Sequence, residues 1–510
     1  MEVLNRAVNI SAEKPIESDD ACKYWYHLQK IFQNQSSKVM QVMKTSTQPI
    51  QPLASGDIAQ EKLKFGEKLS YLLATMAPYP LLGLTSGYLM IFYTNVIGLN
   101  PIAIGTLFLL SRIMDAISDP INGYLIDRLP RSKFGKYRSV MIGGTIVCCL
   151  NFLLLWFGPA WATSGKLTIA YISYLVLGFS FDYMDIPKNS FLPAMTANPK
   201  ERSSLGMLFA LGTIVSGMVV AIIAPLILSA GDLSLKAFST LVLIVTGAVL
   251  VVGIVGALGV KERVVPVDME TKHSLKDYLN ILIQRPVFVT SMYGLMFSAA
   301  LYIPGAVSVY FFTYVMKNLA LASAVAPIQL IGLLLGIFLS AFILRKLGKK
   351  RSYIVAALAM IIVSAIRWLD PTSLALIYIS TIIGGFILGS FKPVTQVIAA
   401  DNIDYVEYKM KYRSEAAVAS IGSFVEKVSS GIAGATPGYV LGWAGYVATS
   451  QTQPANVITV IIWLTIGFPI LFYAASALVF GFGYNLDNNT LQKVEAELSE
   501  RRAANHTSPK

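Results

Sequence analysis

The stretch RIMDAISDPINGYLIDR, from Arg112 to Arg128, decides the fold, because it combines charged side chains with the length and apolar content of a membrane-spanning helix. At about 100° of rotation per residue, Arg112, Asp115 and Asp119 share one helix face. An ionisable group at membrane depth costs about 2.5 kcal/mol or more, so such groups usually face a bundle interior and line an ion or substrate path. The stretch therefore predicts a transport protein.

Composition places the whole chain in the membrane class. The 510 residues are 55% hydrophobic and 14% charged, and their mean hydropathy is +0.59. Hydrophobic runs of about 20 residues, long enough to cross a bilayer, recur from Leu69 to Tyr484. The alternating pattern of a β-barrel does not occur, so we expect an all-α membrane protein.

Twelve transmembrane helices are predicted, six before and six after a polar stretch at 261–285, which indicates two pseudo-symmetric six-helix bundles. The basic turns RSKFGKYR (131–138) and LRKLGKKR (344–351) follow the second and the eighth helix, at matching places in the two halves. The predicted spans are 69–96, 102–126, 139–158, 167–187, 205–229, 237–259, 287–314, 321–344, 353–369, 372–400, 415–441 and 456–482.

Five segments follow from this pattern. Residues 67–260 and 287–484 are the two bundles, 261–286 a central cytoplasmic loop and 485–510 a cytoplasmic tail. Residues 1–66 are polar and contain no signal peptide; we expect a disordered arm, or a true start near Met43.

Loop charges predict the orientation. The loops on one side carry twenty Lys or Arg residues, whereas the opposite loops carry only Lys166, Lys236, Lys317 and Arg367. The positive-inside rule then places both termini in the cytoplasm of a multi-pass protein of the cell membrane. The same loops explain the net charge of +12, so the expected partners are the lipid bilayer and a small solute, with no nucleic acid, and the protein is expected to be a monomer.

The helix at 102–126 holds the predicted cation site. Asp115 and Asp119 lie four residues apart with Ser118 between them, and Arg112 is the one nearby base. The surplus negative charge favours a bound Na⁺ or H⁺. The alternative is that Arg112 and Asp115 form a structural ion pair.

A second acidic pair ends the helix at 167–187, in the stretch FDYMDIPKNSFLP (181–193). Asp182 and Asp185 share a face, and Pro187 can open the helix so that its carbonyl groups line a cavity. These acids are predicted to belong to a binding site; the alternative is a helix cap near the cytoplasmic interface.

Two lysines lie inside predicted helices of the second bundle. Lys427 follows Glu426 in a Gly/Ser-rich helix, and is interpreted as a coupling residue that meets the acids of the first bundle, or else as part of a structural salt bridge. Lys392 precedes Pro393 and is expected to be buried, unless it reaches to the membrane interface.

Charged residues also gather at the predicted cytoplasmic mouth, where they are expected to pair as a gate. These residues are Asp127, Arg128, Asp401, Asp404, Glu407 and Arg413.

An enzymatic function is not predicted. His27, His273 and His506 lie in the arm, a loop and the tail, and Cys148 and Cys149 are neighbours in an apolar helix. No phosphate-binding loop and no spaced metal ligands occur, so no cofactor is expected, and no metal beyond Na⁺ at the cation site.

Four segments resemble the glycoside–pentoside–hexuronide:cation symporters, the group within the major facilitator superfamily that includes melibiose permease. They are YLMIFYTNVIGL (88–99), RIMDAISDPINGYLIDR with RSKFGKYR, MDIPKNSFLP (184–193) with NPKERSSL (198–205), and ADNIDYVEYKMKYRSEA (400–416) followed by Lys427. The resemblance implies the major facilitator fold and symport of a sugar or glycoside with a cation by alternating access. It also implies a cation at Asp115 and Asp119, sugar hydroxyls at Asp185, and Lys427 between the two sites.

Departures from melibiose permease concern both sites. Asp182 replaces a threonine and Ser118 an asparagine at the cation site, whereas Thr75 replaces a sugar-binding aspartate. Aromatic residues of the sugar site are replaced by lysine or asparagine, which favours an anionic solute such as a hexuronide or a sulfonated sugar. The alternatives are a lipid-like solute and a membrane sensor that transports nothing. The predicted substrate-binding residues are Asp185, Lys188, Asn189, Lys392, Thr75 and Arg112.

Overall fold

Helices make up all the regular structure in the described part of the chain, apart from an isolated bridge between Ser132 and Gly135. The computed structural model describes residues 62–130, 132, 135–196, 198–263, 275–411, 415–448, 450, 452–486, 490–494 and 496–499, without the side chains of 116, 120, 127, 275–277, 415 and 416. Residues 1–61, 412–414 and 500–510 are among those outside the description.

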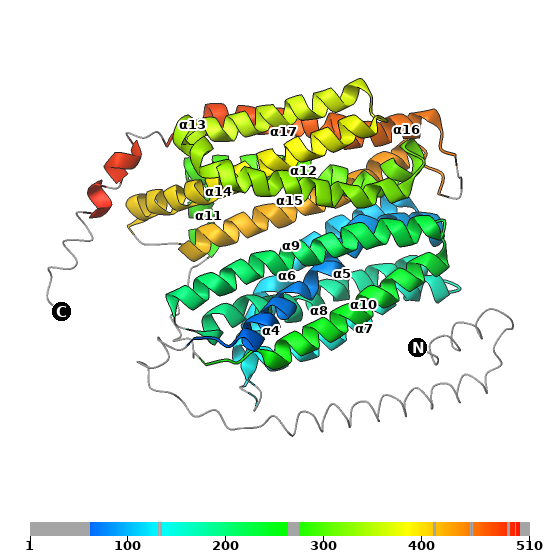
Figure 1. The fold of residues 1–510 in the computed structure, drawn as a ribbon, viewed down its shortest axis with the longest axis horizontal. Helices are drawn as coiled ribbons and strands as arrows, with labels where there is room; N and C mark the ends of the chain where they lie inside the picture. Colours follow the sequence, from blue (N-terminus) through cyan, green and yellow to red (C-terminus); the bar gives the residue numbers. More distant parts are fainter. Residues whose placement is uncertain are drawn as a thin grey trace. The chain divides into compact units, whose positions relative to one another are not determined.

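The first half of the chain runs from α4 to α10 (Figure 1). Its elements are α4 (Phe65–Met76), α5 (Pro78–Ile91), the π-helical turn η1 (Phe92–Val96), α6 (Pro101–Arg128), α7 (Lys136–Trp161), α8 (Lys166–Met195), α9 (Pro199–Ala230) and α10 (Leu235–Gly259).

The second half runs from α11 to α17. Its elements are α11 (Leu275–Leu282), α12 (Arg285–Tyr310), η2 (Phe311–Val315), η3 (Leu319–Ala324), α13 (Val325–Leu369), α14 (Leu374–Met410), α15 (Glu415–Trp443), α16 (Ala455–Ile462), η4 (Trp463–Gly467) and α17 (Phe468–Gly483).

Membrane-spanning length and composition occur in nine helical segments of the described chain. One of them, Leu319–Leu369, holds two passes, because Gly348 adopts a non-helical backbone with φ +72° in the middle of α13. Two further passes fall outside the nine: residues 65–96, which break before Pro78, and α15, which carries Glu426 and Lys427. The described chain therefore makes the twelve helical passes that the sequence predicts.

One helix lies where only a polar loop was expected. Within 261–285 the chain forms α11, and Ile281 of α11 packs against Val287, Val406 and Val418 in a small apolar cluster. This short helix was not predicted, because eight residues with one apolar face are too short and too polar to be recognised from the hydrophobic pattern of spans.

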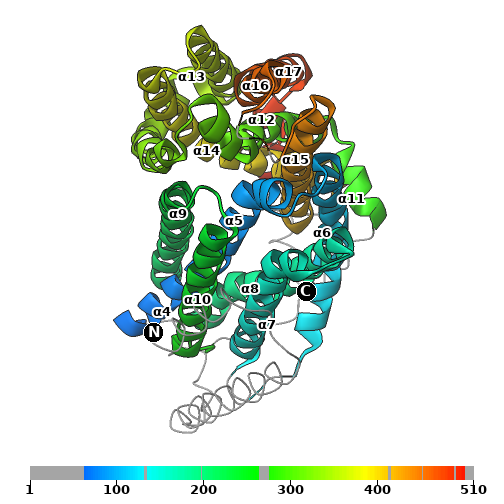
Figure 2. The same ribbon diagram turned by 90° about the vertical axis from the view of Figure 1, so that its right-hand side faces the viewer.

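Packing divides the described helices into two groups. In the first half α7 packs on α8 and α10, and α4 packs on α9 and α10; in the second half α13 folds back on α14, and α12 packs on α15 and α17. Figure 2 shows α15 of the second half directly beside α6 of the first, and these two helices form the largest contact between the halves.

The first membrane pass of each half ends in a similar five-residue sequence, which forms an internal repeat. Residues 92–96 read FYTNV and residues 311–315 read FFTYV, and both form a π-helical turn at the end of their helix. Asn95 and Tyr314 occupy equivalent positions in this repeat, and the Asn95 side chain donates a hydrogen bond to the Tyr314 hydroxyl at 2.6 Å. The pseudo-symmetry of the two halves thus brings equivalent residues together.

Glycines set the crossing of α6 and α15, which run antiparallel. A Cβ built on Gly438 would lie 2.7 Å from the Cα of Gly105, so the two backbones approach as closely as glycine alone permits. The glycine contacts along this crossing are Ile102 with Gly442, Gly105 with Gly438, Phe108 with Gly434, and Arg112 with Gly431.

The same two helices separate toward the end of the molecule that carries the basic loops. A Cβ built on Gly123 of α6, which lies on the same helix face as Gly105, would meet nothing within 4 Å. The halves therefore touch at the end opposite the basic loops, which we call the distal end, and diverge at the basic end. The predicted site residues Asp119 and Lys427 lie close to this divergence.

Candidate functional site

Lys427 and Asp119 join the two halves at the last contact between α6 and α15. The ammonium of Lys427 forms an ion pair with Oδ2 of Asp119, and the side chains are 34% and 36% exposed. The partial exposure leaves both charges within reach of water. The sequence predicted that Lys427 meets an acid of the first bundle, and the structure shows that this acid is Asp119.

Arg112 pairs with Asp115 one turn earlier on α6. Its Nη1 donates to Oδ2 of Asp115 at 2.9 Å. The structural ion pair that the sequence left open is therefore present, but within one helix. Asp115 packs against Gly178 of α8, where a Cβ would lie 2.5 Å from Oδ1, and the stem of Arg112 packs against Gly431 of α15.

Asp182 lies beside α6 with an amide as its partner. Asn122 donates to Oδ2 of Asp182 at 2.8 Å, and no basic side chain of the described chain lies within ion-pair distance of Asp182. Ser118, which is buried, donates to the carbonyl of Asp115 at 3.3 Å. Asn122 was not among the predicted site residues, although it lies one turn beyond Asp119 on the same face of α6.

The charges of this carboxylate site do not cancel. Three acids, Asp115, Asp119 and Asp182, stand against two bases, Arg112 and Lys427, so one negative charge remains when all five are ionised. No three carboxylates, histidines or cysteines of the described chain converge as metal ligands. The arrangement can therefore take one proton or one monovalent cation, but three acids do not meet at one point in this conformation.

Asp185 lies one turn from Asp182 on α8 and binds two neighbours of its own helix. Lys188 donates to Oδ1 at 2.6 Å and Asn189 donates to Oδ2 at 3.2 Å. Lys188 is 1% exposed, so its charge is compensated by Asp185 inside the protein. It is therefore not an uncompensated positive charge of the kind that favours an anionic solute.

Two aromatic rings of the first half enclose Lys188, and the sequence reasoning missed both. Lys188 donates to the Tyr79 hydroxyl at 3.1 Å, and its ammonium lies 4.5 Å from the centre of the Tyr79 ring and 5.2 Å from that of Phe209. The signal for Tyr79 was its place between Pro78 and Pro80, where the first pass breaks.

Thr75 and Lys392 lie away from these contacts. Thr75 is buried, its hydroxyl donates to the carbonyl of Leu72 at 2.7 Å, and it packs against Gly212. Lys392 is exposed, so the expectation of a buried lysine was wrong. The buried face of α14 carries Phe391 and Val394, and Lys392 points away from it.

Pairing at the predicted gate occurs inside the second half. Lys349, from the basic turn inside α13, donates to both oxygens of Asp401 at 2.8 and 2.7 Å. Arg128 is exposed, with its guanidinium 4.2 Å from the Tyr124 ring centre. Asp404 and Glu407 also have interaction partners. Arg413 and the side chain of Asp127 lie outside the described residues.

A polar cluster that the sequence did not predict closes the distal end. The Asn95 side-chain amide donates to the Tyr314 hydroxyl at 2.6 Å, the Tyr446 hydroxyl donates to Oδ1 of Asn95 at 2.7 Å, and the two tyrosine hydroxyls lie 2.8 Å apart. We call Asn95, Tyr314 and Tyr446 the distal lock. Burial raises the pKa of the Tyr446 hydroxyl well above its ordinary value, so this phenol stays neutral.

Contacts around the distal lock seal the two halves together. Thr94 lies 3.2 Å from the Tyr310 hydroxyl, and Thr106 lies 2.9 Å from that of Tyr439. One buried apolar cluster runs through both halves and includes Phe92 on one side and Phe311 on the other.

Comparison with known proteins agrees with this architecture. Residues 70–488 match the family described as MFS/sugar transport protein. The chain is 30% identical over 453 residues to the isoprimeverose transporter of Lactiplantibacillus pentosus, which covers 88% of this chain and 94% of that protein. It is 27% identical over 431 residues to the glucuronide carrier protein homolog of Escherichia coli, which covers 81% of this chain and 91% of that protein.

A solved structure shares the fold. The nucleoside transporter NupG aligns with a TM-score of 0.59 at 15% identity, over 81% of this chain and 99% of that one. Together with the twelve helical passes, the family match over most of the chain confirms the predicted fold class. This chain belongs to the MFS/sugar transport protein family and is a multi-pass membrane protein with the major facilitator fold, a secondary transporter rather than an enzyme.

Proposed function

We propose that this chain is a cation-coupled symporter that carries a sugar or glycoside across the cell membrane by alternating access, as a monomer with both termini in the cytoplasm. The observation that carries the proposal is the surplus carboxylate of the site, Asp182. Asp115 and Asp119 each have a basic partner, whereas Asp182 accepts a hydrogen bond from the amide of Asn122 and has no basic partner among the described residues. A buried acid without a basic partner binds a cation or a proton more favourably than a paired one.

The coupling ion, Na⁺ or H⁺, enters at Asp182. Its arrival neutralises the remaining negative charge, and a Na⁺ ion that also reaches Asp119 competes with Lys427 for that carboxylate. Release of Lys427 removes the ion pair at the end of the α6–α15 contact. Ion binding thus acts directly on the contact between the halves.

The sugar binds close to Asp185. Asp182 and Asp185 are one helical turn apart on α8, so the ion site and the sugar site share one rigid element. The carboxylate of Asp185 and the amide of Asn189, which is exposed, can exchange their mutual hydrogen bond for bonds to sugar hydroxyls. Because linkage is reciprocal, an ion that favours the sugar site is itself bound more tightly when sugar is present.

The charge of the sugar site favours a neutral solute. Lys188 is compensated by Asp185, so Lys392 is the one predicted substrate lysine without an acidic partner in the described chain. A relative named isoprimeverose transporter supports a sugar or glycoside as the cargo, and one named glucuronide carrier protein homolog keeps a hexuronide as the alternative to test.

The conformation is an inward-facing one under the predicted orientation. The distal lock holds the halves together on the outer side, and α6 and α15 diverge toward the basic loops, which the positive-inside rule places in the cytoplasm. Alternating access then requires the distal lock to open and the α6–α15 contact to re-form at the basic end.

Transport in proteoliposomes tests the proposal. Labelled isoprimeverose and a labelled glucuronide are supplied under a Na⁺ gradient or a pH gradient, each applied separately. We expect one gradient to drive accumulation of isoprimeverose, and Asp182→Asn to abolish accumulation while exchange at equal concentrations continues. Asp232→Asn, which changes an exposed acid in the α9–α10 loop, is the matched control. Undiminished accumulation by Asp182→Asn, or binding without any flux, would refute the proposal.

A further inference from the structure

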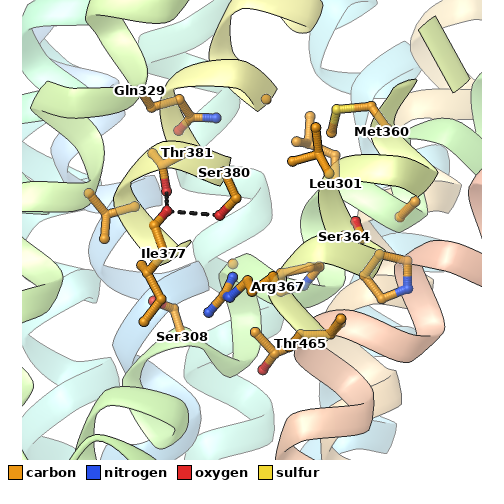
Figure 3. A pocket seen from close by; sticks show the side chains of 18 of the residues that line it. Leu301, Ser308, Gln329, Met360, Ser364, Arg367, Ile377, Ser380, Thr381 and Thr465 are labelled. Atoms are coloured by element: carbon orange, nitrogen blue, oxygen red, sulfur yellow. Dashed lines mark hydrogen bonds between the residues drawn. The ribbon is translucent and has the colours of Figure 1, made fainter. Parts of the chain in front are cut away.

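A cavity lies inside the second half of the chain, apart from the carboxylate site. Its volume is about 420 Å³, and side chains of α12, α13, α14, η4 and α17 line it (Figure 3). None of the predicted site residues is among its lining residues. The volume lies within the range of about 300–1,000 Å³ that is typical of small-molecule sites.

Arg367 of α13 supplies a positive charge to this cavity (Figure 3). Its guanidinium lies 4.9 Å from the centre of the Phe311 ring, and its Nε is buried without a hydrogen-bond partner in the described chain. No ion pair joins it to the neighbouring acid Asp370 in the described chain, and Oδ1 of that carboxylate accepts hydrogen bonds from the backbone and the hydroxyl of Thr372. A buried guanidinium with an unmade hydrogen bond is costly unless a ligand completes it.

Polar side chains around Arg367 fall into two kinds. The hydroxyls of Ser380 and Thr381 both donate to the carbonyl of Ile377, at 2.8 and 2.7 Å, so toward the cavity they can only accept. Ser308, Ser364 and Gln329 also line the cavity, and their side chains make no hydrogen bond within the described residues, so they can donate (Figure 3). A ligand that fits both kinds carries an acceptor near Arg367 and hydroxyl donors elsewhere.

We infer that this cavity binds a small hydroxylated carboxylate of the size of a sugar acid. The planar guanidinium of Arg367 matches a carboxylate by a two-pronged pair of hydrogen bonds, and the ligand hydroxyls donate to Ser380 and Thr381. All lining residues belong to one half, so the site does not depend on contact between the halves. It is separate from the ion and sugar sites proposed above.

Two tryptophans provide a built-in reporter of binding. Trp368 follows Arg367 and stands edge-on to Trp463 of η4, with ring centres 4.8 Å apart, and η4 contributes Thr465 to the cavity wall. Tryptophan fluorescence of the purified full-length protein can therefore be titrated with D-glucuronate and, as a neutral match, with D-glucose. We expect saturable quenching by glucuronate and at least about tenfold weaker binding of glucose, a difference of ~1.4 kcal/mol.

Variants can distinguish ligand binding in this cavity from binding at the proposed transport site. Arg367→Gln is expected to abolish glucuronate quenching and Arg367→Lys to weaken it, whereas Lys317→Gln, an outer-loop lysine outside the cavity, leaves it unchanged. Ser364→Leu fills the cavity without removing the charge and is expected to abolish binding as well, so the test survives if Arg367→Gln does not fold. Accumulation of isoprimeverose is expected to continue in Arg367→Gln.

Three results would overturn the inference. Glucuronate quenching that persists in both Arg367→Gln and Ser364→Leu would place binding elsewhere in the protein. Equal affinity for glucose would remove the role of the carboxylate. If phosphatidylglycerol in nanodiscs competes with glucuronate for binding, and this competition is lost in Arg367→Gln, the cavity would be assigned to a lipid headgroup instead of a soluble sugar acid.

Discussion

Lys427 of α15 and Asp119 of α6 form an ion pair that joins the two halves of the transporter between their glycine contact and the open space at Gly123. On one side of this pair the helices are in glycine-mediated contact from Gly105 to Arg112, and on the other side Gly123, on the same face of α6 as Gly105, faces open space. The pair is therefore both the boundary of the interface and part of the carboxylate site. Protonation of Asp119, or its binding of a cation, therefore weakens the contact between α6 and α15 directly.

The Asp119–Lys427 pair can be tested by exchanging its charges. We expect Asp119→Asn and Lys427→Gln each to lower uphill accumulation at least about tenfold. Each loses about 1 kcal/mol or less of stability, because a third of each side chain is exposed. The double variant Asp119→Lys with Lys427→Asp is expected to regain thermal stability but not accumulation, since the acid then lies on α15. Recovery of full accumulation would show that the pair is only structural.

The glycine crossing can be tested by adding bulk. Gly438→Leu places a side chain where even a Cβ would lie 2.7 Å from Gly105, so it is expected to force the distal end open. In a cysteine-free background with Thr106→Cys, labelling by an impermeant thiol reagent applied outside is expected to rise at least about tenfold. Gly422→Leu, on the open part of the same helix, leaves that labelling unchanged. Equal labelling in both variants would contradict the proposed closure.

The distal lock can be tested through its hydroxyls. Tyr314→Phe removes an acceptor of Asn95 and a partner of Tyr446, a loss of about 1 kcal/mol for each of the two hydrogen bonds, which together favour opening roughly thirtyfold. External labelling at Thr106→Cys is again the measurement, with Tyr378→Phe, a tyrosine of α14 outside the lock, as the control.

The stability of the distal lock is also expected to be independent of pH over the physiological range. Burial raises the pKa of Tyr446, so the neutral phenol is retained from acid up to at least pH ~10, and its contribution is lost only as the pH rises through the raised pKa. Labelling corrected for thiol ionisation should stay constant from pH 6 to 9. A step in that interval would assign the lock to another titrating group.

The buried pair of Lys188 and Asp185 makes a prediction about stability. Lys188→Met leaves the Asp185 carboxylate without its cation and is expected to cost about 1–2 kcal/mol, because water still reaches this carboxylate, which is 33% exposed. The double variant Lys188→Met with Asp185→Asn is expected to recover most of that loss in thermal unfolding. The preference for isoprimeverose over a glucuronide is expected to survive in Lys188→Met; a shift toward the neutral sugar would show that Lys188 attracts anions after all.

Much of the fold could be predicted from the residues alone. Long apolar runs mark each pass, and the predicted span 237–259 differs from α10 by two residues at its start. The acids of RIMDAISDPINGYLIDR were recognised because a charge inside such a run is costly wherever the helix lies. Lys427 was recognised for the same reason.

The partners of those charges could not be predicted. Lys427 could have met Asp115, Asp119 or Asp182; the antiparallel crossing at Gly105 and Gly438 aligns it with Asp119. The distal lock depends on a tyrosine 351 residues from Asn95, and no local pattern links the two.

What the sequence determined by itself is therefore the set of helices, their membrane character and the presence of buried acids and bases, because these follow from the free energy of transferring each side chain into lipid. What only the tertiary structure decided is which acid remains without a base, where the halves separate, and that Arg367 faces a cavity. Those outcomes depend on how helices distant in sequence cross, and the crossing is set by small residues whose packing is visible only once both helices are in place.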